Sequence, residues 1–270
     1  MNSNAAIMGQ GGFGTVRAVT LNCNVYAAKT MSSATHFDYE VRIHKLFMER
    51  IVEAQCAYTP QHIAIMHSCN YTTRTIYFEL ASCDLMTVCL KGHFGEKAIR
   101  MIKYLPLCVN ELHAKGIIHN DIKPENFLIM EDGRVTLCDL GCACVCDGDE
   151  VAVVEGTACY CSPEQLGACY DNKNVVTFES DNYALGTTIF CVACGFNPFD
   201  NSGTLSTSEI RKLRMAGFDR DFLRNVERNE PGWEGEWMQA YGLSEVLRGF
   251  LRYNPGDRLS LTEGYRMIDI

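Results

Sequence analysis

The first 80 residues of the chain alternate short apolar runs with polar turns, which predicts strands around one helix. Four apolar runs share the length and the flanking turn formers of β-strands: 16–21, 25–31, 63–67 and 75–80. The polar tripeptide at 22–24 predicts that the first two runs form a hairpin. Apolar residues recur at helical spacing over 37–51, so we expect a helix to cross this β-rich unit.

Helical spacing dominates the rest of the chain. Three segments show it: 98–113, 183–194 and 244–252. Pro106 is expected to bend the first helix and Gly116 to cap it. The second segment is apolar nearly all round, which indicates a buried helix. The pattern therefore predicts an α+β fold, with a small β-rich part followed by a larger helical part.

Composition limits the class of protein. Of 270 residues, 47% are hydrophobic and 21% charged, which is ordinary for a globular protein. No apolar run approaches the roughly 18 residues of a membrane span, so no membrane partner is expected. A net charge of −9 argues against nucleic acid as a general partner. Fifteen cysteines, without a secretory signal, indicate reduced thiols in the cytoplasm or nucleus.

Two segments near the N-terminus suggest phosphate binding. The first is the glycine-rich string at 9–16, Gly-Gln-Gly-Gly-Phe-Gly-Thr-Val. Glycines let a backbone approach phosphates closely, although such a string can also be a plain turn. Because two strands rather than a helix are predicted after it, a loop bridging antiparallel strands is favoured. The second segment is the strand ending near Lys29, about 15 residues past the glycines, where a lysine can reach the same phosphates.

Two later segments carry catalytic residue types. His119-Asn-Asp-Ile-Lys-Pro-Glu-Asn126 places a carboxylate, a lysine and a carboxamide within six residues. A carboxylate can accept a hydroxyl proton, a lysine neutralises phosphate charge, and an asparagine oxygen can ligate Mg²⁺. Cys138-Asp-Leu-Gly141 follows an apolar strand and supplies a second hard oxygen ligand.

Taken in order, these motifs resemble those of eukaryotic-type serine/threonine protein kinases over almost the whole chain. Three more segments add to the resemblance. Gly156-Thr157 with Ser162-Pro-Glu164 is similar to the end of an activation segment, with serine where the family has alanine. Asp181 resembles the buried aspartate that steadies the catalytic loop. Arg258 resembles the late arginine that pairs with the glutamate here numbered 164.

The resemblance implies a single kinase domain over 1–270, with an N-lobe to about residue 82 and a C-lobe from about 83. It implies ATP and Mg²⁺ as cofactors and Ser/Thr hydroxyls of proteins as acceptors. Asp121, Lys123 and Lys29 are the expected catalytic residues, and Asn126 and Asp139 the metal ligands. The expected ATP-binding residues are Gly9, Gln10, Gly11, Gly12, Phe13 and Gly14 of the glycine loop, Val16, Ala27 and Leu128 around the adenine, Lys29 with Glu40, Glu79 and Ala81 between the lobes, and Cys138.

Departures from the family pattern leave alternatives open. The partner of Lys29 is expected to be Glu40, only 40 − 29 = 11 residues on, in preference to Glu49. This short interval and the string 139–144 resemble some herpesvirus kinases, which implies a viral origin. Asn120 replaces the usual arginine, and 142–155 contains no Ser, Thr or Tyr, so activity without activation-loop phosphorylation is expected.

The competing functions are an ATP-binding scaffold without catalysis and a small-molecule phosphotransferase of the aminoglycoside type. The intact lysine and carboxylate set argues against the first, and the Gly-Thr…Ser-Pro-Glu segment against the second. The cysteines clustered between 138 and 161 are read as small packing side chains, with zinc binding and redox sensing as lesser alternatives.

Overall fold

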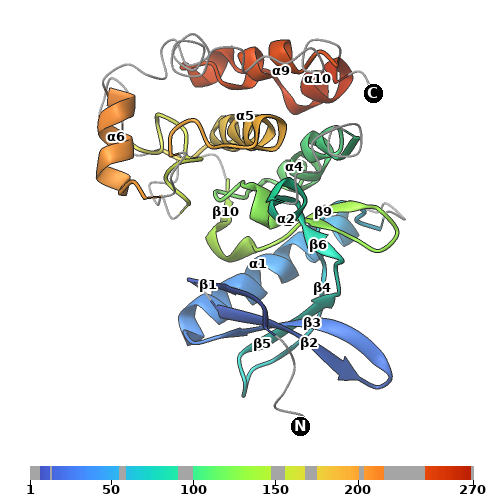
Figure 1. Ribbon diagram of the computed structural model, residues 1–270. Helices are drawn as coiled ribbons and strands as arrows, with labels where there is room; N and C mark the ends of the chain where they lie inside the picture. Colours follow the sequence, from blue (N-terminus) through green and yellow to red (C-terminus); the bar gives the residue numbers. More distant parts are fainter. Residues whose placement is uncertain are drawn as a thin grey trace.

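The computed structural model describes residues 7–12, 14–54, 59–90, 100–146, 156–167, 175–200, 204–215 and 241–268. It confirms the predicted bilobal arrangement, with a β-rich N-lobe and a mainly helical C-lobe (Figure 1). No helix within the described ranges combines the length and the apolar character needed to span a bilayer.

The N-lobe is built on an antiparallel five-stranded sheet with the order β1-β2-β3-β5-β4. The predicted hairpin is confirmed, since Asn22 and Cys23 between β2 and β3 have φ values of 49° and 67°. Two such residues match the right-handed twist of the strands they join. The strands are β1 Ile7–Gly11, β2 Gly14–Leu21, β3 Asn24–Met31, β4 Met66–Asn70 and β5 Thr75–Glu79.

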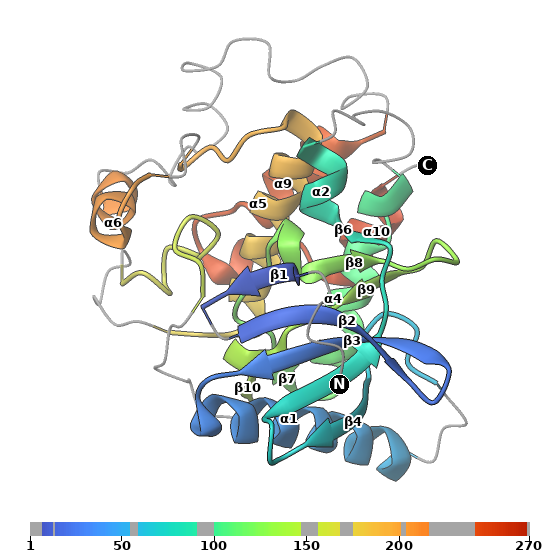
Figure 2. The same ribbon diagram turned by 60° about the horizontal axis from the view of Figure 1, so that its bottom comes forward.

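The predicted helix is α1, Ala34–Glu53, which begins where the Ser33 side chain accepts a hydrogen bond from His36 N. It lies against one face of the sheet (Figures 1 and 2), where Phe37 and Val41 pack on strand residues. The strand predicted at 63–67 is present but begins later in the chain, since β4 starts only at Met66. Ile63 instead bridges to Leu137 and is buried in the C-lobe core, which fixes it away from the sheet.

The C-lobe is organised around the buried helix α5, Phe178–Cys194, as its apolar pattern predicts. Residues 98 and 99 lie outside the described residues, and the prediction of one bent helix over the rest is wrong: the helix that ends at residue 102 is followed by a turn, and α4, Leu105–His113, begins after it. Pro106 lies in the first turn of α4, where its missing N–H costs nothing. Gly116 adopts the expected left-handed conformation two residues past the cap.

The remaining helices pack on α4 and α5 or lie at the edge of the lobe. The predicted helix over 244–252 is confirmed as α9, which contacts α5, while α10 packs on α4. These helices are α2 Leu85–Leu90, α6 Thr207–Met215, α9 Leu243–Phe250 and α10 Leu261–Met267.

Short strands place the central loops between the lobes. A three-stranded sheet has the order β6-β8-β9, and β10 pairs with β7. Their bounds are β6 Cys83–Asp84, β7 Ile117–Ile118, β8 Phe127–Ile129, β9 Val135–Leu137 and β10 Cys144–Val145. The segment 119–126 therefore leaves β7 and enters β8, and residues 138–143 connect β9 to β10.

Candidate active site

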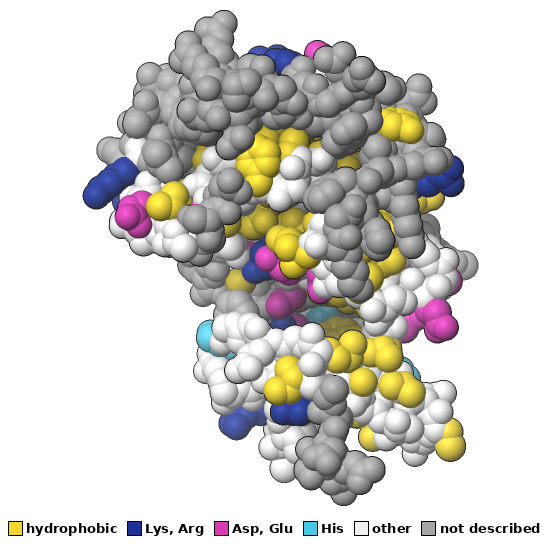
Figure 3. Space-filling model, in the orientation of Figure 1, with side chains coloured by type: hydrophobic (Ala, Val, Ile, Leu, Met, Phe, Trp, Pro, Cys, Tyr) yellow, Lys and Arg dark blue, Asp and Glu magenta, His cyan; other side chains and the backbone are white. Residues whose placement is uncertain are grey.

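Three charged side chains from distant parts of the sequence meet between the lobes. Lys29 Nζ on β3 lies 2.9 and 2.7 Å from the two carboxylate oxygens of Glu40 on α1. The same Nζ lies 2.8 Å from Asp139 Oδ1, after β9. Figure 3 shows acidic and basic side chains gathered in the hollow between the lobes. The trio has one positive and two negative groups, which suits a site that also receives a cation.

Burial and pairing shift the pKa values of this trio. Burial acts to lower the pKa of Lys29, but the carboxylates of Glu40 and Asp139 outweigh it and raise that pKa. Burial raises the pKa of Glu40 to about 6, although Lys29 opposes the shift. For Asp139, burial acts to raise the pKa, but Lys29 outweighs it and the pKa is lowered. All three groups are therefore charged at neutral pH.

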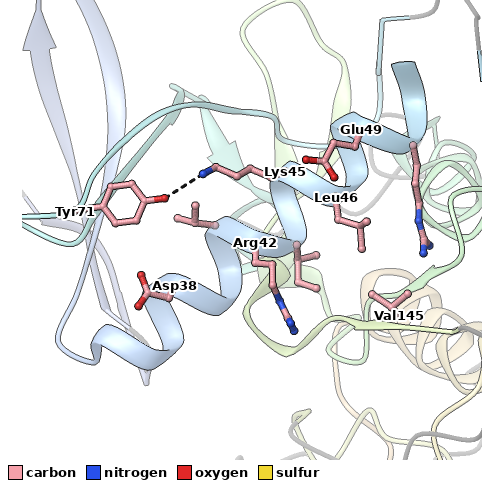
Figure 4. A pocket seen from close by; sticks show the side chains of 10 residues that line it. Asp38, Arg42, Lys45, Leu46, Glu49, Tyr71 and Val145 are labelled. Carbon is pink, nitrogen blue, oxygen red and sulfur yellow. Dashed lines mark hydrogen bonds between the residues drawn. The ribbon is translucent and has the colours of Figure 1, made fainter. Parts of the chain in front are cut away.

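The structure pairs Lys29 with Glu40 and not with Glu49. Only two residues separate β3 from α1, so a helix starting at Ala34 brings Glu40 opposite Lys29 within two turns. Glu49 lies instead in a pocket of about 740 Å³ that α1 forms with Tyr71 and Val145 (Figure 4). The short interval in the sequence is thus accommodated by a short loop.

The glycine-rich segment bridges two antiparallel strands, as expected. In the register of β1 and β2, Gly11 faces Gly14. A Cβ on Gly14 would lie 2.5 Å from Thr30 O, so this glycine is required by packing on β3. A Cβ on Gly9, Gly11 or Gly12 would meet nothing within 4 Å, so packing does not explain these glycines. Gln10 lies between them in β1, and Phe13 lies outside the described residues.

The strand register places the expected adenine-binding side chains near Lys29. Ala27 is two residues before Lys29, and Val16 is its direct partner on β2, so all three share one face of the sheet. Leu128 is half-buried in β8, across the interlobe hollow, and Cys138 follows β9.

Glu79 and Ala81 lie where the chain passes from one lobe to the other. The exposed side chain of Glu79 accepts a hydrogen bond from Arg134 Nη2 at 3.3 Å. It therefore points toward the surface. Ser82 N donates to Ile129 O at 2.9 Å, which attaches this connection to the C-lobe.

Asp121 is the centre of a second cluster, in the loop between β7 and β8. Its Oδ1 accepts from Thr157 N at 2.9 Å and from Thr157 Oγ1 at 2.8 Å. Its Oδ2 lies 2.7 Å from Lys123 Nζ and 3.2 Å from Asn126 Nδ2. Burial acts to lower the pKa of Lys123, but Asp121 outweighs it and raises that pKa. The carboxylate, ammonium and carboxamide predicted to act together thus share one small site.

Hydrogen bonds to Cys138 link the two clusters. Cys138 N donates to Asn126 O at 2.9 Å, and Cys138 O is 2.9 Å from His119 Nε2. Because Cys138 directly precedes Asp139, these bonds fix the second carboxylate relative to the Asp121 loop. Asp139 itself has a left-handed backbone with φ 64° and accepts from Gly141 N at 3.3 Å.

The buried Asp181 of α5 accepts hydrogen bonds from the backbone of the Asp121 loop, as expected. Its carboxylate accepts from His119 N at 2.7 Å and Asn120 N at 2.9 Å, and lies 2.8 Å from His113 Nε2. An anionic acceptor for two consecutive backbone amides is a strong constraint on loop geometry. The loop is therefore positioned by the C-lobe core before any ligand binds.

The expected pair of Glu164 with Arg258 is present and buried. Arg258 Nη2 lies 2.7 Å from Glu164 Oε2, and Nη1 contacts Oε1, so the pair is bidentate. Burial acts to raise the pKa of Glu164, but Arg258 outweighs it and lowers that pKa. The pair anchors the segment that carries Thr157 to the C-lobe.

All six cysteines between 138 and 161 are buried or half-buried. Within the described part of the chain, no three His, Cys, Asp or Glu side chains are grouped to hold a metal ion. Burial raises the pKa of Cys138 far above its ordinary value, which disfavours the reactive thiolate. Burial raises the pKa of Cys144 to about 12 for the same reason.

The residues expected to hold Mg²⁺ fit that ion by chemistry. Asn126 Nδ2 donates to Asp121 O at 2.7 Å, so its amide oxygen is left as a neutral hard ligand. Asp139 supplies an anionic oxygen. The pKa of its carboxyl group is lowered, so the group is ionised at neutral pH.

Two contacts were not foreseen from the sequence. The Tyr39 hydroxyl donates to Ala143 O at 2.7 Å, and Gln165 Nε2 donates to Asn120 Oδ1 at 2.8 Å. The only sequence signal for either is the position of Tyr39, directly before Glu40. Both contacts join segments far apart in the sequence.

Comparisons with known proteins agree with this geometry. The family model for the protein kinase domain matches residues 3–267. The chain is 29% identical over 274 residues to cGMP-dependent protein kinase, isozyme 2 forms cD5/T2, of Drosophila melanogaster, covering 96% of this chain and 26% of the relative. It is 28% identical over 267 residues to cGMP-dependent protein kinase 2 of Mus musculus, covering 94% and 31%.

A plant protein is similar over a smaller part of the chain. The identity with 3-phosphoinositide-dependent protein kinase 1 of Arabidopsis thaliana is 27% over 219 residues, or 70% of this chain and 43% of the relative. The chain thus spans less than half the length of each of these three relatives.

Proposed function

Because the chain belongs to the protein kinase family, we propose that it transfers the γ-phosphate of ATP to serine and threonine hydroxyls of proteins. The observation that carries the proposal is the joint presence of the Lys29–Glu40–Asp139 trio and the Asp121–Lys123–Asn126 cluster. Phosphoryl transfer requires positioning and charge neutralisation more than covalent chemistry, and these two clusters supply both.

The N-lobe residues are proposed to bind the nucleotide. Lys29, held by Glu40, would contact the α- and β-phosphates, and the amides of the glycine loop would cover them. Val16 and Ala27 would pack over the adenine, with Leu128 below it. Bound Mg²⁺, held by Asn126 and Asp139, would supply positive charge to the phosphates.

The C-lobe cluster is proposed to act on the acceptor. Asp121 would orient the attacking hydroxyl and accept its proton, while Lys123 would neutralise charge on the γ-phosphate. Thr157 bonds to both Asp121 and Lys123, and this threonine together with Lys123 favours serine and threonine as acceptors.

Activity without activation-loop phosphorylation is part of the proposal. The segment 142–155 contains no residue that a kinase can phosphorylate. Asn120 stands where a phosphate-binding arginine would be needed, and its amide is bonded to Cys142 O and Gln165. The alternative, a scaffold that binds ATP without catalysis, is disfavoured because each catalytic side chain is present and bonded.

The acceptor sequence is proposed to carry basic residues upstream of the hydroxyl. The side chain of Glu125 is exposed beside the Asp121 cluster. Asp84 is engaged as a cap, since it accepts from Thr87 N at 2.6 Å, which leaves Glu125 as the main recognition group. Such an acidic surface attracts arginine or lysine.

The short Lys29–Glu40 interval favours a viral member of the family, acting in the cytoplasm or nucleus of the host cell. Both the viral origin and this location stay predictions.

The proposed function is tested by transfer from γ-labelled ATP with Mg²⁺ to casein, myelin basic protein and a basic Ser/Thr peptide. Asp139→Asn, purified in parallel, is the matched control. Label on serine or threonine that is lost in the variant supports the proposal. Tight Mg²⁺-dependent ATP binding without transfer under any condition supports the scaffold alternative.

A further inference from the structure

The segment that follows Asp139 is attached to both lobes by uncharged hydrogen bonds. Two consecutive carbonyls accept them: Cys142 O from Asn120 Nδ2 at 3.2 Å, and Ala143 O from the Tyr39 hydroxyl at 2.7 Å. The next residues form β10 against β7, and Cys146 N donates to Gly116 O at 2.9 Å. The chain from 142 to 146 is therefore held along its whole length.

Asn120 joins this segment to a third part of the site. While its Nδ2 donates to Cys142 O, its Oδ1 accepts from Gln165 Nε2 at 2.8 Å. Gln165 is buried, and its Oε1 accepts from Ser162 N at 2.8 Å. One buried carboxamide thus links the Asp121 loop, the segment after Asp139 and the segment that carries Thr157.

Tyr39 joins the same segment to α1. Tyr39 is adjacent to Glu40, whose carboxylate holds Lys29. The Arg42 guanidinium lies 5.0 Å from the centre of the Tyr39 ring, which further restricts the ring. A hydrogen bond from Tyr39 to Ala143 therefore fixes the part of α1 that presents Glu40.

We propose that Tyr39 is a positioning residue for the Lys29–Glu40 pair, and that Asn120 holds the segment to which Tyr39 bonds. We call these two side chains, with the carbonyls of Cys142 and Ala143, the neutral clamp. The inference rests on the proposed function and gives it a regulatory consequence: the catalytic arrangement is assembled without a phosphate.

The chemistry of the neutral clamp explains why no phosphate is required. In kinases whose loops are ordered by phosphorylation, a new charge pairs with arginine. Here a phenol and a carboxamide make the corresponding links to backbone carbonyls, and neither group carries a charge at neutral pH. The links persist as long as the chain is folded, so the clamp is expected to be constitutive and insensitive to salt.

The test is a double-mutant cycle on the full chain, after phosphatase treatment and confirmation by mass spectrometry that no phosphate remains. Tyr39→Phe removes one hydroxyl and keeps the ring. Tyr71→Phe is the matched control, because the Tyr71 hydroxyl also bonds to α1. It accepts from Lys45 Nζ at 3.1 Å in the pocket that α1 forms with Tyr71 and Val145 (Figure 4). Each change is made in the parent chain and in Glu40→Gln, and kcat/KM for a basic Ser/Thr peptide is measured.

We expect Tyr39→Phe to lower kcat/KM about tenfold in the parent chain, the upper end of the range for one lost hydrogen bond. In the Glu40→Gln background, where the carboxylate no longer holds Lys29, the same change should cost less than about twofold. Tyr71→Phe should leave kcat/KM within about twofold of its background. The midpoint of thermal unfolding should fall by about 2–4 °C in Tyr39→Phe, by the same amount in both backgrounds, and should not change in Tyr71→Phe.

Two results would overturn the inference: no loss in Tyr39→Phe, or an equal tenfold loss in both backgrounds, which is the behaviour of a residue acting independently of Glu40. A parallel cycle with Asn120→Asp, which replaces the donor to Cys142 O by an acceptor, should also be non-additive with Tyr39→Phe. The first measurement of the series is the activity of the parent chain. If the parent chain transfers no phosphate, the proposed function itself is overturned, and this outcome differs from a failure of the inference about Tyr39.

Discussion

Replacing His44 by leucine should make the protein more resistant to acid. His44 lies one turn after Glu40 on α1, is 1% exposed, and neither of its ring nitrogens has a hydrogen-bond partner. Its ring packs on Phe78 at 5.3 Å between centroids. Burial lowers the pKa of His44 from 6.5 to about 3. The charge of Lys29 adds to this shift, and the charge of Asp139 opposes it. The folded protein therefore holds this imidazole neutral.

The sign of the effect follows from proton uptake. Below pH 6.5 the unfolded chain binds a proton at His44 that the folded chain does not, so stability is complete above pH 6.5 and declines toward pH 3. With these two pKa values, the loss between pH 8 and pH 5 is about 2 kcal/mol, or roughly 4–8 °C in the unfolding midpoint of a chain this size. Leucine has a similar volume and no proton to gain.

The assay is urea unfolding followed by circular dichroism at pH 8, 6.5 and 5, for the parent chain and His44→Leu. As the pH falls, Glu40 on the same helix changes the stability in the opposite direction. Its pKa is raised to about 6, so the folded chain binds this proton at a higher pH than the unfolded chain does. The informative quantity is therefore the difference between the two proteins at each pH. We expect the free energy of unfolding of His44→Leu, relative to that of the parent chain, to be about 2 kcal/mol higher at pH 5 than at pH 8. A constant difference across this range would refute the reasoning.

Three further predictions follow from the site. Arg258→Met should lower the free energy of unfolding by about 3–5 kcal/mol, because Glu164 is left charged and buried; a loss below 1 kcal/mol in urea unfolding would contradict this. Glu125→Gln should raise the KM for a peptide with upstream arginines about tenfold and leave the KM for ATP unchanged, and equal effects on an arginine-free peptide would argue against direct recognition. Iodoacetamide at pH 7.5 should alkylate the exposed Cys23 well before Cys138, whose pKa is raised by burial; faster labelling of Cys138 by mass spectrometry would show a reactive thiolate.

The parts of the structure that the sequence predicts are those set by local pattern. The hairpin around Asn22, helix α1 and the buried helix α5 follow from spacing of apolar and turn-forming residues. The pairing of Lys29 with Glu40 followed from the position of Glu40 in its motif, even though the interval is short. The structure supplies the reason, which is a two-residue connection before α1.

The parts that the sequence did not predict depend on tertiary contacts. The apolar run that includes Ile63 is typical of a strand, but the Ile63 side chain is buried against the C-lobe and the strand begins at Met66. A proline within a helical pattern predicts a bend, whereas Pro106 lies in the first turn of a new helix. Tyr39 and Ala143 are 104 residues apart, and no local periodicity relates a tyrosine on a helix to a carbonyl in a distant loop.

The most direct test of the proposed kinase activity is phosphoamino-acid analysis after transfer from γ-labelled ATP by a preparation that mass spectrometry shows to carry no phosphate. The Asp121 cluster and the neutral clamp predict label on serine or threonine of the acceptor, reduced by several orders of magnitude in Asp121→Asn while Mg²⁺-dependent ATP binding is retained. Label on tyrosine, an equal rate in Asp121→Asn, or activity only after prior phosphorylation of the chain would contradict it.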